Sequence, residues 1–243
     1  MTFISRKPTL SSSAFLLALM VSGCSSDSTP KADLSPSQQG MRATQLCNDL
    51  LDTEGGAALE EITDSQYFTE TRGTGDQQVN KLPQAATKLR ATASFERRSK
   101  KINLCLPNAT GESAANNLAI SAQWLRTTSK DYSWQSSDDI TTFDISGTGD
   151  KDVKLPYAYA GKKFAGFDFR CPVGPGSNEA TVLAVEILGS LNSMTTNQAE
   201  KSPELLTHIA HTVAVKLAKE LDCFSESRIP EALGTLKKFP PAG

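Results

Sequence analysis

The 243-residue chain has little histidine, few aromatic residues and no long hydrophobic run. Only two histidines are present, and phenylalanine, tyrosine and tryptophan together make up 7% of the residues. A membrane-spanning helix needs about 20 consecutive apolar residues, and no stretch of the chain provides them. Glycine-rich phosphate loops, Gly-x-Ser-x-Gly elbows and Cys-x-x-Cys pairs are missing as well. The sequence therefore predicts no catalytic residue, no cofactor site and no metal site.

The charge balance excludes a second group of functions. The chain holds 25 basic and 27 acidic residues. Two of the basic residues, Arg6 and Lys7, lie among the first 23 residues, which contain no acid. The rest of the chain thus carries 25 − 2 = 23 cations against 27 anions. A net negative charge with mixed signs predicts neither a nucleic-acid partner nor a basic patch for anionic lipid.

The first 23 residues have the three parts of an export signal. Arg6 and Lys7 supply the positive region, residues 14–21 are all apolar, and small residues then lead into Cys24. Eight apolar residues span only about 12 Å as a helix, which is too short for a permanent membrane span. We expect residues 1–23 to be a cleaved signal peptide.

The end of this signal resembles the lipobox of bacterial lipoproteins. The sequence Val21-Ser22-Gly23-Cys24 has a cysteine at the position that this class of protein lipidates, and a polar stretch, 24–36, follows as a flexible tether. An ordinary signal peptide with a chance cysteine at the cut is the alternative. The resemblance implies a diacylglycerol on Cys24, with further acylation such as palmitate, and two acyl chains hold a protein stably on a bilayer.

The layout of the whole chain is similar to that of small actinobacterial surface lipoproteins of unknown function. A lipobox, a polar tether, a cysteine in the first helix and a late helix ending in cysteine carry this resemblance. It implies an extracytoplasmic protein that is anchored to the cell membrane through its lipid. It implies no active site.

Four cysteines remain once Cys24 carries the lipid, namely Cys47, Cys105, Cys171 and Cys223. An even number of well-separated cysteines in an exported domain favours two disulfide bonds. A Cys/His metal site is the weaker alternative. Pairing between neighbouring elements favours Cys47–Cys105 and Cys171–Cys223, although Cys47–Cys223 would join the terminal helices and stays open.

Hydrophobic periodicity predicts helices at both ends of residues 37–243 and strands between them. Gly55-Gly56 is expected to end the first helix, and Ser202 with Pro203 to begin the last one. The Ser/Thr/Asp-rich stretch 127–142 is expected to be a long loop. Helices are expected near 41–51, 57–62, 82–97 and 202–222, and strands near 102–106, 118–125, 164–171 and 181–188.

This order of elements favours one α+β domain. No strand–helix alternation suggests parallel crossovers, so we expect an antiparallel sheet of about four to six strands. The N-terminal and C-terminal helices should pack on one face of that sheet.

Two groups of residues are candidates for function. His208 and His211 lie three residues apart on the last expected helix, where they could act as a general base or bind a metal. Surface or boundary positions without such a role are the favoured interpretation. Aromatic residues could line a ligand groove, although core packing is favoured for them. These are Trp124, Tyr132, Trp134, Tyr157 and Tyr159.

Three hypotheses about function follow. The first is a non-catalytic module that binds an envelope protein or a small ligand. The second is a cell-envelope hydrolase whose site is assembled only in the fold, and the third is a structural or regulatory component. A cleft that joins a histidine to carboxylates would favour the enzyme, whereas an aromatic surface would favour binding.

Overall fold

The computed structural model describes residues 40–75, 78–92, 100–111, 114–126, 140–145, 155–173 and 181–238. The chain divides into two compact units, Met1–Ser35 and Pro36–Gly243, and all described residues belong to the second. The expected signal peptide, lipidated Cys24 and tether lie outside the described residues. Within those described ranges, no helix is both long enough and apolar enough to cross a membrane.

In its described residues, the second unit is built on one antiparallel sheet of nine strands, where the sequence predicted four to six. The strand number was therefore wrong, while the α+β class and the antiparallel arrangement are confirmed. Several of the extra strands have only two to four residues, too few for an alternating pattern to be recognised. The order across the sheet is β1 (Phe68–Glu70), β3 (Pro107–Ala109), β4 (Asn117–Arg126), β8 (Thr181–Ser190), β7 (Phe164–Arg170), β6 (Tyr157–Ala160), β5 (Thr141–Asp144) and β9 (Lys237–Lys238), with β2 (Ile102–Cys105) also paired to β4.

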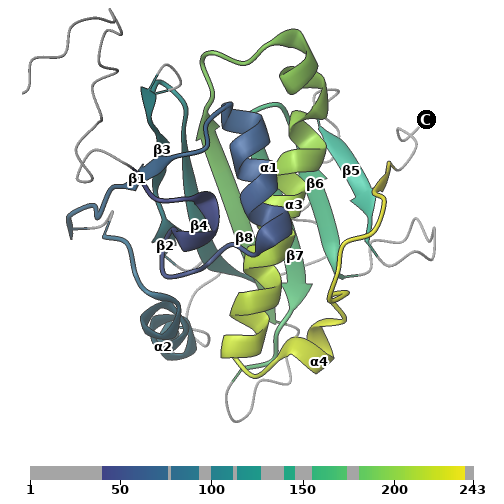
Figure 1. Cartoon of the computed structure of the whole chain (residues 1–243). Helices are drawn as coiled ribbons and strands as arrows, with labels where there is room; N and C mark the ends of the chain where they lie inside the picture. The colour runs from purple at the N-terminus through teal and green to yellow at the C-terminus, as the bar shows by residue number, and fades with distance from the viewer. Residues whose placement is uncertain are drawn as a thin grey trace, which may run out of the picture. The chain divides into compact units, whose positions relative to one another are not determined.

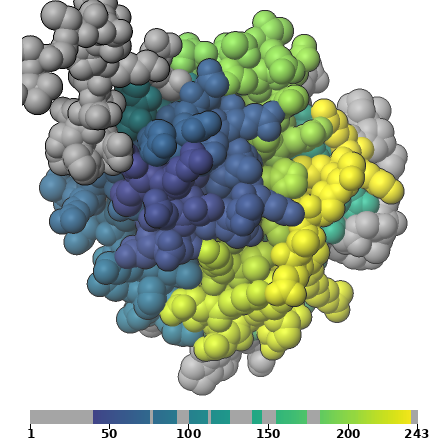
Figure 2. Space-filling model, viewed as in Figure 1, coloured from purple at the N-terminus to yellow at the C-terminus, as the bar shows by residue number. Residues whose placement is uncertain are grey.

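Figure 1 shows the helices α1 (Thr53–Thr63) and α3 (Thr196–Glu220) in front of the sheet, and α2 (Leu82–Thr92) near its lower left edge, below β2. Helix α3 packs on β6, β7 and β8, α1 packs on α3, and α2 packs on β2. In Figure 2, seen from the same side, the N-terminal elements (purple and blue) lie beside α3 and the C-terminal segment (green to yellow). We call this side of the sheet the helical face.

The main hydrophobic core lies between the helical face and α3. Alternate residues of β7 and β8, such as Phe167, Phe169 and Val185, point toward the apolar stripe of α3 and are fully buried. On α3 that stripe includes Ile209 and Val213, also fully buried. Burial of these side chains supplies the main hydrophobic stabilisation of the unit.

Gly55 and Gly56 lie inside α1 instead of ending a helix, which corrects the expectation from the sequence. A Cβ atom on Gly55 would lie 2.8 Å from the hydroxyl oxygen of Thr212 on α3. The helix is capped by Asp52, whose carboxylate accepts hydrogen bonds from Gly55 N and from the Thr212 hydroxyl. The glycine thus allows α1 to approach α3 closely.

The expected helix over 41–51 is replaced by a short 3₁₀ turn, η2 (Ala43–Gln45), and a left-handed segment. Cys47, Asn48 and Asp49 have φ between 52° and 58°. Asn and Asp tolerate this conformation better than most residues. The Glu70 side chain of β1 accepts a hydrogen bond from Cys47 N, so the chain follows the sheet edge there instead of continuing a helix.

Helix α3 begins before Ser202 and Pro203, which both lie inside it. Thr195 is the N-cap, and it forms a reciprocal capping box with Gln198 in which the two hydrogen bonds measure 2.8 and 3.3 Å. Ser202 instead donates its hydroxyl hydrogen to Lys162 O in the β6–β7 turn. The stretch expected as a loop also ends early, since β5 begins at Thr141 and residues 127–139 lie outside the described residues.

Two disulfide bonds join neighbouring elements, in the pairing that the sequence favoured. Cys47 bonds to Cys105 with a Cα–Cα distance of 5.5 Å, and Cys171 bonds to Cys223 with a Cα–Cα distance of 5.3 Å. The first bond ties the turn after η2 to β2. The second ties the end of β7 to the end of α3.

Candidate functional site

The candidate site is the other side of the sheet, which we call the second face. The ring of Phe167 meets the ring of His211 of α3 at a centroid distance of 5.6 Å, which fixes the side that Phe167 occupies. Side chains alternate along a strand, so Gly166 and Asp168 point to the second face. None of the helices in the described ranges packs there.

The first row of residues on the second face crosses four strands. Gln123 of β4 pairs with Ala184 of β8, which pairs with Asp168 of β7, which pairs with Tyr157 of β6. All four side chains are buried, Asp168 completely. A buried carboxylate next to a tyrosine is an unusual choice for the middle of a sheet, because burying a charge is costly unless polar groups surround it.

The second row is formed by the residues that lie two positions away from the first row on each strand. Ser121 of β4 pairs with Glu186, which pairs with Gly166, which pairs with Tyr159 and then with Thr142 of β5. This row is more exposed than the first at Glu186, Tyr159 and Thr142. The two rows together place carboxylate, amide, hydroxyl and aromatic groups on adjacent strands.

Glu186 is the polar centre of the second row. Its carboxylate forms an ion pair with the ammonium group of Lys101 and accepts a hydrogen bond from the side-chain amide of Gln123. The Glu186 side chain is 16% exposed and that of Lys101 is 43% exposed, so solvent reaches this cluster. Charge-assisted hydrogen bonds of this kind fix the direction of a carboxylate.

The ring of Tyr159 lies across the neighbouring strand at Gly166. A Cβ atom at that glycine would come within 2.0 Å of the ring carbon Cζ and within 2.2 Å of the hydroxyl oxygen. Only glycine leaves room for the ring to lie on the backbone of β7. The ring of Tyr157 is 6.0 Å away between centroids and tilted by 31°. The two tyrosines thus form an aromatic surface beside the Glu186 cluster.

In the first row, the surroundings of Tyr157 shift the pKa of its hydroxyl group. Burial raises the pKa of the Tyr157 hydroxyl to about 12, and the negative charge of Asp168 acts in the same direction. A hydrogen bond with Thr142 acts in the opposite direction. Tyr157 therefore stays protonated at neutral pH and is able to donate a hydrogen bond.

The structure does not bring the two histidines together with a catalytic partner. His211 is buried, and its Nε2 atom lies 2.8 Å from Pro230 O. Burial lowers the pKa of His211, and that effect outweighs the hydrogen bond to Pro230 and the carboxylates of Asp52 and Glu54. His208 lies one turn away on α3 and is only partly buried. These contacts give His211 a packing role between α3 and the C-terminal segment.

The aromatic residues that were candidates in the sequence lie in different parts of the protein. Tyr157 and Tyr159 lie on the second face, but Trp124 is buried on the helical side, where its Nε1 donates to Leu89 O of α2 at 2.8 Å. Tyr132 and Trp134 lie outside the described residues. Within the described part of the chain, no group of three or more His, Cys, Asp or Glu residues could hold a metal ion.

Sequence reasoning missed the polar members of the second face. Asp168 and Glu186 stand among apolar residues of β7 and β8, and an alternating pattern places such residues on the side away from the core. The pattern thus predicts a shared face for the two carboxylates once the strands are known to be neighbours. It does not predict that Asp168 is buried there.

No known protein family, curated protein or solved structure matches this chain significantly. The functional argument therefore rests on the geometry of the two faces.

Proposed function

We propose that the protein is a lipid-anchored, extracytoplasmic binding module that takes a polar ligand on its second face. The lipobox sequence ending at Cys24 supports the anchor. The two disulfide bonds support export, because such bonds persist in oxidising compartments and are rare in the cytosol. The extracytoplasmic side of the cell membrane is the location that both features favour.

The observation that carries the binding role is the combination of Tyr159 and Glu186. The ring of Tyr159 over Gly166 offers an apolar surface. The Glu186 carboxylate lies on the adjoining strand β8, and the Gln123 amide that binds it lies on β4, the strand beyond β8. Binding sites commonly join an aromatic surface to a few fixed polar groups. A sugar ring has the matching chemistry, since it has an apolar C–H face and hydroxyl groups at its rim.

Calorimetric titration of the full chain with a soluble N-acetylglucosamine oligosaccharide tests this proposal. Gly166→Val places a side chain where the Tyr159 ring lies, so we expect at least a tenfold loss of affinity, and Tyr159→Ala should give a similar loss. Thr69→Ala is the matched control, because Thr69 is an exposed residue on the edge strand β1. Absence of binding by the parent chain, or equal binding by Gly166→Val and the parent, would overturn the oligosaccharide site.

One arrangement favours a second candidate, an envelope hydrolase. Asp168 and Glu186 are diagonal neighbours on adjacent strands, so their backbone positions lie about 7–8 Å apart. A pair of neighbouring carboxylates is the minimal acid–base machinery of glycoside hydrolysis. Against it, Asp168 is fully buried and Glu186 is held by Lys101 and Gln123. Slow hydrolysis of the same oligosaccharide that disappears in Glu186→Gln would favour the enzyme over the binding module.

A further inference from the structure

Two exposed apolar side chains lie together where the described chain begins. Large hydrophobic residues are exposed at three described positions, and two of these, Met41 (37% exposed) and Tyr67 (46%), are close in space. Met41 pairs with Phe68 through two backbone hydrogen bonds of 2.8 and 2.9 Å, so it lies beside the strand that Tyr67 precedes. Most exposed apolar residues stand singly, so a pair at one edge calls for an explanation.

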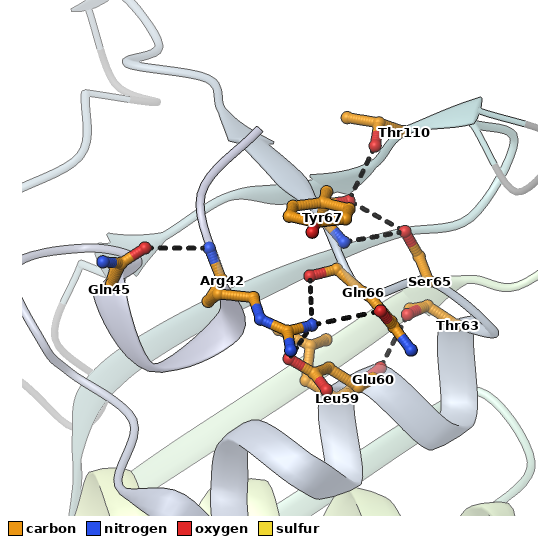
Figure 3. A network of polar contacts seen from close by, with 9 residues as sticks. All are labelled: Arg42, Gln45, Leu59, Glu60, Thr63, Ser65, Gln66, Tyr67 and Thr110. Atoms are coloured by element: carbon orange, nitrogen blue, oxygen red, sulfur yellow. Dashed lines mark hydrogen bonds and ion pairs between the residues drawn. The ribbon is translucent and has the colours of Figure 1, made fainter. Parts of the chain in front are cut away.

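Arg42 completes this pair with a positive charge. Its guanidinium carbon lies 5.4 Å from the centre of the Tyr67 ring, and its Nη1 atom lies 3.7 Å from the Glu60 carboxylate. Figure 3 shows the Arg42 side chain held between Gln66 and Glu60, with longer hydrogen bonds of 3.4 Å to Gln66. We call Met41, Arg42 and Tyr67 the edge patch. It is an ordered surface with both apolar and cationic groups.

The edge patch lies beside the first described residue, Gly40, which follows Cys24 in the sequence. A Cβ atom at Gly40 would lie 2.6 Å from Phe68 O, so the backbone at Gly40 lies close to that of β1. Cys24 and Gly40 are 40 − 24 = 16 residues apart. A chain of that length spans at most roughly 55 Å. Any surface to which Cys24 is fixed is therefore within easy reach of the edge patch.

We propose that the edge patch docks into the headgroup region of the bilayer that holds Cys24. Tyrosine and arginine side chains suit this region, because each has an apolar body and a polar end. Two half-exposed side chains contribute too little to bind a membrane alone, but a short tether raises the effective concentration to the millimolar range. This inference rests on the proposed lipid anchor and gives the domain a fixed orientation.

The neighbouring charges indicate that docking does not depend on anionic lipid. Glu60 pairs with Arg42, and Glu61 pairs with Lys201 at 2.9 Å, so each of these two cations is balanced by a carboxylate. Attraction to an anionic surface needs an excess of cations, and it weakens as salt is added. We therefore expect docking to vesicles of phosphatidylcholine, with little effect of salt.

Quenching of tryptophan fluorescence by brominated acyl chains tests the orientation. The full lipidated chain carrying Tyr67→Trp is bound to phosphatidylcholine vesicles that contain brominated lipid. The control is Ala232→Trp, because the adjacent Glu231 pairs with Lys219 near the far end of α3. A helix of 25 residues is about 37 Å long, and its first turns contact Glu61, near the edge patch. We expect the added quenching over the parent chain to be at least twofold greater for Tyr67→Trp than for Ala232→Trp.

Two outcomes separate this inference from the anchor on which it rests. If the parent chain does not bind vesicles, or if Cys24→Ala binds them as well as the parent, the lipid anchor itself is wrong. If the chain binds through Cys24 but both tryptophans are quenched equally, the domain tumbles freely and only the docking is overturned. Adding Met41→Ser to Tyr67→Trp should lower the quenching toward the value of Ala232→Trp, because it removes an apolar side chain of the edge patch.

Discussion

The two faces of the sheet use the same strands for different purposes. On the helical face, Phe167 and Phe169 of β7 are fully buried against α3. On the second face, the residues between and beside them are Gly166, Asp168 and Arg170, none of which has an apolar side chain. One strand therefore contributes apolar burial to one side and polar groups to the other.

This difference separates stability from recognition within the fold. The helical face also holds both disulfide bonds: Cys105 aligns with the buried Ile120, and Cys171 joins the end of α3. The second face holds the ion pair of Lys101 with Glu186 and the two tyrosines. We expect changes on the helical face to alter the free energy of unfolding, and changes at the more exposed residues of the second face, Tyr159 and Glu186, to alter binding.

The first and largest predicted effect is on the helical face. Phe167→Ala should lower the free energy of unfolding by about 3–5 kcal/mol, because it removes a fully buried ring from the core under α3. Leu188→Ala is the matched control on the second face, where the side chain is 53% exposed and the loss should stay below about 0.5 kcal/mol. Chemical denaturation measures both. Similar losses at the two positions would break the distinction between the faces.

Sequence reasoning recovers the helical face better than the rest of the fold. Strands β4 and β7 are predicted because their apolar residues alternate over several positions, and β8 because it is a long continuous apolar run. The two-residue β9 repeats no pattern and forms only through its pairing with β5. The start of α3 was misplaced for a similar reason, since Ser202 and Pro203 form a plausible cap and the tertiary contact of Ser202 with Lys162 O is invisible in the sequence.

The second face was predicted only in part. Tyr157 and Tyr159 were recognised because they alternate in a glycine-rich segment. Their relation to Asp168 and Glu186 depends on strand order, which joins residues up to 29 positions apart (186 − 157). Gly166 shows the limit most clearly, because its role is to make room for a ring on another strand. No local pattern encodes such a contact.

The second prediction concerns the disulfide bonds of the helical face. The double variant Cys171→Ser/Cys223→Ser opens a loop of 52 residues and should lower the free energy of unfolding by about 2–4 kcal/mol. The loop between Cys47 and Cys105 spans 58 residues, so the matched double variant should lose nearly the same amount. Denaturation of both variants checks this. A much smaller loss for either pair would show that its bond adds little to the constraint on the unfolded chain.

The third prediction has the smallest expected effect. It concerns how the free energy of unfolding depends on pH through Tyr157 of the second face. Burial raises the pKa of Tyr157 on the second face from 10.0 to about 12. The folded chain thus holds this proton more tightly than the unfolded chain does. The resulting stabilisation is fully present below pH 10 and is lost as the pH rises from 10 toward 12. Tyr157→Phe should remove this alkaline loss, as denaturation between pH 8 and 12 would measure.

His211 on the helical face gives the opposite response. Burial lowers its pKa below the ordinary value of 6.5, so the unfolded chain binds this proton more readily than the folded chain. Stability is then complete above pH 6.5 and declines as the pH falls below it. His211→Gln, which keeps a donor for Pro230 O, should flatten the acid side of the profile and leave the alkaline side unchanged. Because the two groups titrate in separate pH ranges, each variant should alter only one end of the pH profile. A change by either variant at both ends would show that the two titrations are coupled.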